Sequence, residues 1–420
     1  MFRLIRFTLV ALVLLTIAAA RPAEAANTLP AHQGKTTESL PAAPLACDPD
    51  EVQASGAVYR ICMPTTQWNG DLLVWAHGYV SPTEPVGIPE GQMTLPGGQS
   101  IADVANFLGL AFATTSYSTN GLAVVQGIAD LVDLVDIFTA TKGAPNTVYL
   151  IGASEGGVIT ALAMERHPDV FNGGLAMCGP YGDFRDQINY FGDLRVVFDY
   201  FFPGLLPGSP VDVPDWLMED WDSYYETNIK PAIEDPANAG LVDEILNVTQ
   251  APSDVEDSTT KESTIQSLLW YSVLATNDGR EKLGGQPFDN QDRVYAGSDD
   301  DAELNQGVQR FSADQSALDE IAGNYQTTGR LSVPLVTLHT TGDPVIPYWH
   351  ATRYRGKTIL ADNIALHEHF SVDRYGHCAF TSAEVFTAFD RLGNMVNNPP
   401  PYRPAVRSLL PLILATSGEN

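Results

Sequence analysis

The chain has 420 residues, of which 44% are apolar, and its formal net charge is −28. This length and apolar content suffice for one large core with an insertion, and they exclude a disordered or fibrous protein. The strong negative charge argues against binding to nucleic acid or to an anionic membrane surface.

The N-terminus has the pattern of a secretory signal peptide. Arg3 and Arg6 precede an apolar run over residues 7–20, and the small residues Ala23 and Ala25 follow. The run is shorter than the about 20 apolar residues that a membrane-spanning helix needs. We therefore expect cleavage after Ala25, a secreted or periplasmic protein and no stable membrane anchor.

Short β-like runs and helical patterns alternate in the first part of the chain. Strands are expected at 58–62, 72–76, 110–115, 147–151 and 171–178, with helices at 101–108, 122–139 and 157–165. A continuous apolar run such as 72–76 is typical of a strand that is buried on both faces. The alternation predicts an α/β fold with a mostly parallel central sheet flanked by helices.

This alternation stops between residues 181 and 330 and resumes with an apolar strand at 333–338. The interrupted stretch has helical patterns and contains 29 Asp and Glu against 9 Lys and Arg. Because the α/β pattern returns after it, we expect an inserted, mainly helical cap or lid. A last strand is expected at 365–372, followed by a helix that begins with the capping box of Thr381 and Glu384.

These patterns divide the chain into five parts. The expected parts are a signal peptide at 1–25, an N-terminal leader at 26–55, an α/β core at 56–180 and 331–396, a cap at 181–330 and a C-terminal tail at 397–420.

The four cysteines indicate disulfides in an exported protein. Four cysteines allow three pairings; we favour Cys47 with Cys62, which closes a short N-terminal hairpin, and this leaves Cys178 with Cys378. The spacing of cysteine and histidine suggests no zinc site, so we expect no metal.

The segment Gly152-Ala153-Ser154-Glu155-Gly156 joins an apolar strand to a helix. A nucleophilic serine needs a tight turn of this kind to expose its hydroxyl, and glycines are needed where strand and helix meet closely. The alternative is an ordinary strand–helix turn in which Ser154 caps the helix. We expect Ser154 to be the nucleophile.

A serine hydroxyl needs a base within reach, and the base needs an orienting acid. Asp343 follows the strand 333–338 directly, in a turn set by Gly342 and Pro344, and His377 lies on the loop after the last strand. The alternative for Asp343 is a turn aspartate that bonds its own backbone. We expect Asp343 and His377 to complete the triad.

An oxyanion hole needs two N–H donors. We expect one at Glu155, directly after the nucleophile, and the second at Tyr79, where Gly78 allows the backbone to approach closely.

The segments WAHGY, GASEG, TTGDPVIP and YGHCAF resemble the oxyanion loop, nucleophile, acid and base segments of the α/β-hydrolase superfamily, in that superfamily's chain order. The resemblance covers residues 56–180 and 331–395. It implies an α/β-hydrolase fold with the mainly helical cap inserted after the sixth strand, as in many esterases and lipases. In that fold, Cys178 and Cys378 both lie at the active-site end of the sheet, where a bridge between them would hold the histidine loop.

The resemblance implies a secreted serine hydrolase of carboxylic esters that acts through an acyl-enzyme and needs no cofactor. Its partner would be a small-molecule or polymeric ester, neutral or cationic rather than polyanionic. The alternatives are a serine peptidase or aminopeptidase of the same fold and a non-catalytic binding protein. Aromatic residues at the start of the cap either line an acyl pocket or pack the cap: Phe184, Tyr190, Phe191, Phe198, Tyr200, Phe201 and Phe202.

Overall fold

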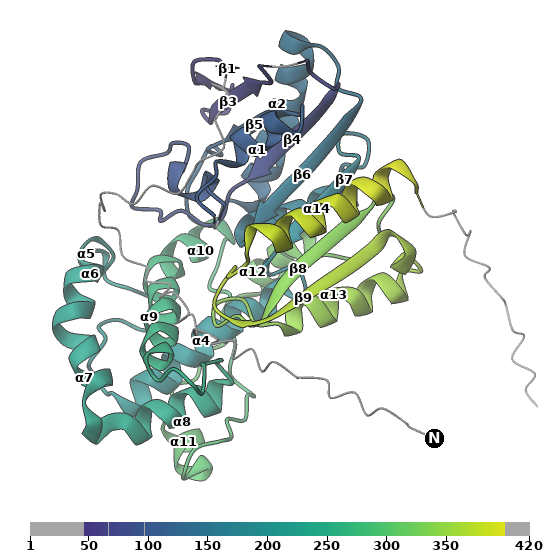
Figure 1. Ribbon diagram of the computed structural model, residues 1–420. Helices are drawn as coiled ribbons and strands as arrows, with labels where there is room; N and C mark the ends of the chain where they lie inside the picture. Colours follow the sequence, from purple (N-terminus) through teal and green to yellow (C-terminus); the bar gives the residue numbers. More distant parts are fainter. Residues whose placement is uncertain (1–45, 66, 96, 400–420) are drawn as a thin grey trace, which may run out of the picture. The chain divides into compact units, whose positions relative to one another are not determined.

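The computed structural model describes residues 46–65, 67–95 and 97–399 (Figure 1). The expected signal peptide, most of the leader and nearly all of the tail lie outside the described residues. No helix in the described ranges is long and apolar enough to cross a membrane.

A mixed sheet forms the centre of the core. Within the described residues it has nine strands in the order β1-β3-β5-β4-β6-β7-β8-β9, and β2 also pairs with β3. The strands are β1 (Ala46–Cys47), β2 (Glu51–Val52), β3 (Val58–Met63), β4 (Asp71–Ala76), β5 (Ala111–Thr115), β6 (Thr147–Ala153), β7 (Gly173–Met177), β8 (Leu335–Gly342) and β9 (His367–Tyr375). The pairings from β5 through to β9 are parallel, whereas β1, β2 and β5 run antiparallel to β3. The prediction of a mostly parallel sheet is confirmed.

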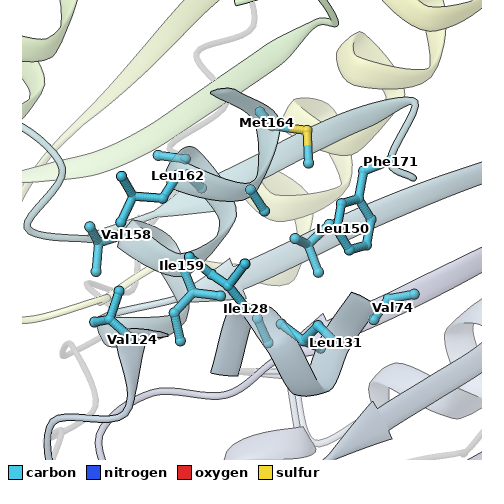
Figure 2. Close-up of a cluster of buried hydrophobic side chains, with 14 of the residues drawn as sticks. Val74, Val124, Ile128, Leu131, Leu150, Val158, Ile159, Leu162, Met164 and Phe171 are labelled. Carbon is cyan, nitrogen blue, oxygen red and sulfur yellow. The ribbon is translucent and has the colours of Figure 1, made fainter. Parts of the chain in front are cut away.

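Helices cover both faces of this sheet. On one face, apolar side chains of α2 (Val124–Lys142) and α3 (Glu155–Arg166) pack on β4 and β6, as Figure 2 shows, and α13 (Trp349–Leu360) joins the same cluster through Tyr354. On the other face lie α1 (Ile101–Phe107) and α14 (Ser382–Asn397), and Figure 1 shows α14 across β7 and β8. Burial on both faces explains why the strands are apolar throughout.

The chain between β7 and β8 is mainly helical and has a hydrophobic cluster of its own, built largely from α4, α8 and α9. Its elements are α4 (Phe184–Phe201), α5 (Asp215–Glu219), α6 (Trp221–Tyr224), η2 (Tyr225–Ile229), α7 (Lys230–Glu234), η3 (Pro236–Asn238), α8 (Ala239–Thr249), α9 (Thr259–Leu274), α10 (Thr276–Lys282), α11 (Asp301–Gly307), α12 (Gln315–Glu320) and η4 (Ile321–Tyr325). The expected position after the sixth strand is wrong: the insertion follows β7, which is the seventh described strand in chain order, or the fifth if the two-residue strands β1 and β2 are left out.

Several boundaries differ from the expected ones. Helix α3 begins at Glu155, directly after Ser154, rather than at residue 157. The last strand begins at His367 rather than at residue 365, because residues 364–366 form the short 3₁₀ turn η5 (Ile364–Leu366). The capping box of Thr381 and Glu384 does open α14.

Helix α13 has no counterpart among the expected elements. Its buried residues have helical spacing, but half of them are polar: His350, Ala351, Tyr354 and Thr358. A search for apolar periodicity therefore misses this helix.

Candidate active site

Ser154 occupies a sharp turn between β6 and α3. Its backbone φ is 57°, a left-handed conformation that costs a residue with a side chain about 1–3 kcal/mol. Glycine is required beside it, because a Cβ at Gly152 would lie 2.2 Å from the carbonyl oxygen of Gly156, and a Cβ at Gly156 would lie 2.1 Å from that of Ala76. The turn presents the Ser154 hydroxyl at the N-terminus of α3.

The imidazole of His377 joins Ser154 to Asp343. Its Nε2 lies 2.9 Å from the Oγ of Ser154, and its Nδ1 lies 2.8 Å from the Oδ2 of Asp343. Because an ionised carboxylate only accepts hydrogen bonds, Nδ1 carries the proton and Nε2 accepts from the serine hydroxyl. The structure thus brings together the three residues that the sequence predicts as a triad.

Asp343 is fully buried beyond the carboxyl end of β8. Its Oδ1 accepts hydrogen bonds from the backbone N–H groups of Val345 and Ile346, each at 2.9 Å. The Nε2 of His339 lies 3.6 Å from Oδ2 but is 2.8 Å from the carbonyl oxygen of Ile346, to which it donates. Burial lowers the pKa of His339 and keeps it neutral. The carboxylate is therefore fixed by two N–H groups on one oxygen and by His377 on the other.

The loop after β4 lies against Ser154. A Cβ at Gly78 would lie 3.1 Å from the Cβ of Ser154. The N–H of Gly78 donates to the Oε1 of Gln92 at 2.7 Å. Gly78 therefore allows the loop to approach Ser154 closely, but its own N–H is not free to donate to a substrate. The N–H of Tyr79 has no acceptor among the described residues. Glu155 is the first residue of α3, so its N–H has no partner within the helix.

Gln92, which the sequence analysis missed, holds this loop from both ends. Its Oε1 accepts from the N–H of Gly78, and its Nε2 donates to the carbonyl oxygen of Tyr79 at 3.1 Å. The peptide N–H of Tyr79 lies between these two anchored groups. Gln92 belongs to the 3₁₀ helix η1 (Glu90–Met93), which Glu90 ties to Arg60 of β3 at 2.8 Å. Nothing in the local sequence marks this glutamine, because its partners are distant in the chain.

The side chain of Glu155, the residue after Ser154, is buried. Its Oε1 accepts from the N–H of Ala123 at 2.8 Å, and its Oε2 has no partner among the described residues. Burial raises the pKa of Glu155 to about 8, although the hydrogen bond from Ala123 and the charge of Lys282 each lower it. Glu155 is therefore mainly protonated and uncharged at neutral pH.

A pocket with a volume of about 130 Å³ opens beside Ser154. The core supplies part of its wall, through Tyr79, Leu122, Ser154, Glu155, Pro180 and Ile346. The insertion supplies most of the rest, including Phe184, Ile188, Phe191, Gly192, Tyr271, Ala275, Gly279, Leu283 and Phe288. Of the aromatic residues at the start of the cap, Phe184 and Phe191 thus line a pocket, whereas Phe198 and Phe202 pack inside the insertion.

Tyr271 of α9 lines the pocket beside Ser154, and the sequence analysis missed it. Its ring stacks on Phe191 with centroids 5.1 Å apart and meets the edge of Tyr79 at 5.5 Å. Burial raises the pKa of Tyr271, and the proximity of the Ser154 side chain offsets part of this rise. The insertion therefore contributes a polar group to the surroundings of Ser154.

Both expected disulfides, Cys47–Cys62 and Cys178–Cys378, are present in the structure. Cys178 follows β7 and Cys378 follows His377, and both have positive backbone φ angles, of 42° and 52°. The Sγ of Cys378 lies 3.6 Å from the Nε2 of His377. The bridge therefore ties the histidine loop to the end of a central strand.

The described residues contain one group of side chains spaced as metal ligands, namely Cys178, His377 and Cys378. Because the two sulfurs form a disulfide, they do not offer the thiolates that bind metals.

Residues 122–363, more than half of the chain, match the family described as serine aminopeptidase, S33. The chain belongs to this S33 family. It is therefore a serine hydrolase of the α/β-hydrolase superfamily, and the superfamily expected from the sequence is confirmed. The family match includes Ser154 and Asp343 but ends before His377 and begins after Tyr79. No curated protein sequence matches this S33 family member.

Several solved structures resemble this member of the family. An acylaminoacyl peptidase from Pyrococcus horikoshii has 9% identity and a TM-score of 0.43 over 86% of this chain and 43% of its own. An esterase from Pyrococcus furiosus has 11% identity and a TM-score of 0.43 over 84% and 90%. Feruloyl esterase B from Aspergillus oryzae has 14% identity and a TM-score of 0.42 over 83% and 79%.

The chain spans only 37% and 43% of the lengths of two acylaminoacyl peptidases that it matches. The identities and TM-scores of all these matches are too low to indicate a substrate.

Proposed function

We propose that the chain is a secreted carboxylic ester hydrolase in which Ser154, His377 and Asp343 form the catalytic triad. The observation that supports this most directly is the unbroken series of hydrogen bonds from the Ser154 hydroxyl through both nitrogens of His377 to buried Asp343. A serine flanked by a base and an orienting acid in this order is the arrangement that activates a hydroxyl for attack.

In the proposed reaction, Ser154 attacks the ester carbonyl carbon while the Nε2 of His377 takes the hydroxyl proton. The ester C–O bond then breaks, and His377 returns the proton to the departing alcohol. Water attacks the acyl-enzyme in the same way, with His377 again as base, and releases the acid and free Ser154. Asp343 stabilises the imidazolium that forms in both steps.

The N–H groups of Tyr79 and Glu155 are the proposed oxyanion donors. Each lacks an acceptor in the loop or helix that carries it, and removing one donor of such a pair costs about 10²–10³-fold in kcat in other hydrolases. Gln92 serves as a positioning residue, since it anchors the backbone on both sides of the Tyr79 N–H.

The chemistry of the pocket favours an ester over an N-terminal peptide as the substrate. An aminopeptidase needs a carboxylate to hold the substrate ammonium group. The only acid among the described lining residues is Glu155, and its raised pKa of about 8 keeps it uncharged at neutral pH. The family description nevertheless favours an aminopeptidase, which is the second candidate function.

Secretion is proposed from the N-terminal sequence and from the disulfides. Cys47–Cys62 and Cys178–Cys378 fit an oxidising compartment. We also propose the division into a signal peptide at 1–25, a leader at 26–55, a core at 56–180 and 331–396, a cap at 181–330 and a tail at 397–420.

One substrate panel tests the proposed function. Purified protein is assayed on p-nitrophenyl esters, on aminoacyl anilides and on N-acylated anilides, and the residue labelled by a fluorophosphonate is identified by mass spectrometry. We expect ester turnover and labelling of Ser154. Anilide turnover without ester turnover would support the aminopeptidase. Absence of both turnover and labelling would support a non-catalytic binding protein.

The raised pKa of Glu155 predicts a loss of activity at alkaline pH. Above pH 8 Glu155 ionises and places a negative charge beside the position where the oxyanion forms. We expect kcat/KM to fall about tenfold by pH 9. Glu155→Gln keeps an acceptor for the Ala123 N–H and stays neutral, so its kcat/KM should not show this fall.

The same group predicts a pH dependence of stability. Burial raises the pKa of Glu155 from 4.5 to about 8, so its contribution to stability is complete below pH 4.5 and is lost as the pH rises to about 8. Urea unfolding at pH 5 and pH 8.5 should show a smaller decline for Glu155→Gln than for the wild type. Glu219→Gln, at an exposed acid, is the control; equal declines in all three proteins would refute the assignment.

The Cys178–Cys378 bridge is predicted to support catalysis as well as stability. A displacement of about 1 Å can cost about 10²-fold in rate, so we expect kcat of the double variant Cys178→Ala/Cys378→Ala to fall by about 10- to 100-fold. The matched control is Cys47→Ala/Cys62→Ala, which removes the other bridge and should retain kcat. If kcat of both double variants tracks their thermal stability, or if both thiols of the active-site pair are free in the native protein, this role is disproved.

A further inference from the structure

The pocket beside Ser154 is small and mostly apolar. Its volume of about 130 Å³ is close to that of an apolar protein cavity of about 150 Å³ that binds benzene. A group that fills it therefore has about four to seven carbon atoms. Phe184, Ile188, Phe191, Leu283 and Phe288 supply apolar surface to the wall.

Neither of the two ionisable residues Arg280 and Glu155 in the pocket wall is placed to hold a charged substrate group. The Nη1 of Arg280 donates to the Oδ1 of Asp212 at 2.9 Å and to the carbonyl oxygen of Val211 at 3.0 Å, so its charge is already balanced at the exposed rim. The Oε1 of Glu155 is occupied by Ala123, and its Oε2 is sealed from solvent. The wall therefore fits an uncharged group.

Gly279 of α10 stands out among the lining residues. It is buried, its φ is not in the left-handed region, and a Cβ built on it would meet no atom within 4 Å. Because the residue is buried yet faces open space, the space is the pocket itself. Gly192, the other lining glycine, has no such room, since its Cβ would lie 2.3 Å from the ring of Phe288.

We propose that the pocket takes the acyl group of the ester, that this group is uncharged and short, and that Gly279 sets its maximum length. The proposal rests on the proposed function and names its substrate class: esters of acyl groups of about four to seven carbons, straight-chain or with a single ring. Gly279 is a specificity-determining residue in this proposal, because any side chain at this position takes volume from the acyl site.

The test compares the wild type with Gly279→Ala and Gly279→Leu on p-nitrophenyl acetate, butanoate, hexanoate, benzoate and dodecanoate. The wild type should turn over butanoate, hexanoate and benzoate at least tenfold faster than dodecanoate, as kcat/KM. Gly279→Leu should lose at least tenfold on hexanoate and benzoate but less than twofold on acetate. Gly279→Ala should lose less, in the same order. A leucine side chain occupies most of the space that the additional carbons of the longer acyl groups need. The acetyl group is too short to reach residue 279.

Two controls separate this result from a general loss. Gly240→Leu makes the same change on helix α8, where a Cβ also meets no atom within 4 Å but does not line the pocket, and it should leave the chain-length preference unchanged. Butanoate esters of methanol, butanol and hexanol should keep their relative rates in Gly279→Ala, because only the alcohol differs between them.

The outcomes are distinct. Equal losses on acetate and hexanoate, a wild-type optimum at dodecanoate, or a change confined to the alcohol series would overturn the proposal while leaving the esterase intact. If Gly279→Leu does not fold, the order of rates in Gly279→Ala decides the matter. Absence of turnover and of fluorophosphonate labelling in the wild type would instead be a failure of the proposed function.

Discussion

Ser154→Ala is expected to lower kcat on a p-nitrophenyl ester by roughly 10⁴- to 10⁶-fold, with little change in KM. The hydroxyl is the only atom of Ser154 that takes part in the proposed reaction, and it supplies the oxygen of the acyl-enzyme. Without it, only the oxyanion donors and the pocket remain, and these alone retain a small acceleration over water. The variant should also escape labelling by the fluorophosphonate.

Ser272→Ala is the matched control for this experiment. Ser272 lies on α9 and also lines the pocket, but it makes no hydrogen bond with His377 among the described residues. Its replacement should change kcat by less than about threefold, as expected for a change away from the reacting atoms. Retention of more than 1% of the wild-type kcat by Ser154→Ala, after activity from contaminating esterases is subtracted, would exclude Ser154 as the nucleophile.

The convergence of Ser154, His377 and Asp343 could be predicted because each of these residues is tied to a local signal. Gly152 and Gly156 mark a turn that admits no side chain, and an apolar strand precedes both Ser154 and Asp343. In a parallel sheet the carboxyl ends of the strands lie at one edge, so residues that follow different strands meet there. The order of the strands along the chain was enough to bring these side chains together.

The residues that shape the pocket could not be predicted in this way. Tyr271 and Gly279 belong to helices of the insertion, and their positions in the pocket wall depend on how those helices pack, which no local pattern specifies. Gln92 is similar: its importance comes from two backbone groups of a loop 13 and 14 positions away. No local sequence pattern distinguishes such residues, and they acquire their role only in the folded chain.

Glu155 illustrates a different limit. Its position directly after Ser154 predicts that its N–H is an oxyanion donor, but the state of its side chain depends on burial that the sequence does not reveal. In the structure the carboxyl group lies beside the N-terminus of α2, where the N–H of Ala123 favours the charged form, yet desolvation outweighs this and raises the pKa to about 8. The sequence predicts an acid at this position, and the fold makes it neutral.

Asp343→Asn is expected to lower kcat by about 10⁴-fold, although the two side chains have nearly the same size. The reason lies in how the carboxylate is held. Its Oδ1 accepts two backbone N–H groups, so an asparagine must place its carbonyl oxygen there. The NH₂ group then faces the Nδ1 of His377 and donates to it. His377 is forced to carry its proton on Nε2, where it cannot accept the proton of Ser154.

Asp373→Asn is the control for this change, because Asp373 is an exposed residue of β9 whose Oδ1 accepts from Thr341 at 2.9 Å. Its kcat should stay within about threefold of the wild type. KM and thermal unfolding measured on all variants will separate a loss of catalysis from a loss of structure.

Asp343→Ala distinguishes an effect on the histidine tautomer from an effect on packing. Alanine leaves a cavity but forces no tautomer on His377, so water can enter and accept the Nδ1 proton. If the carboxylate acts by fixing the protonation of His377, asparagine must impair kcat at least as much as alanine, despite its better fit. If the carboxylate only supports the loop after β8, asparagine must be the milder change, because it keeps the hydrogen bonds from Val345 and Ile346. A milder asparagine variant would therefore remove Asp343 from the triad and leave it a structural residue of the turn.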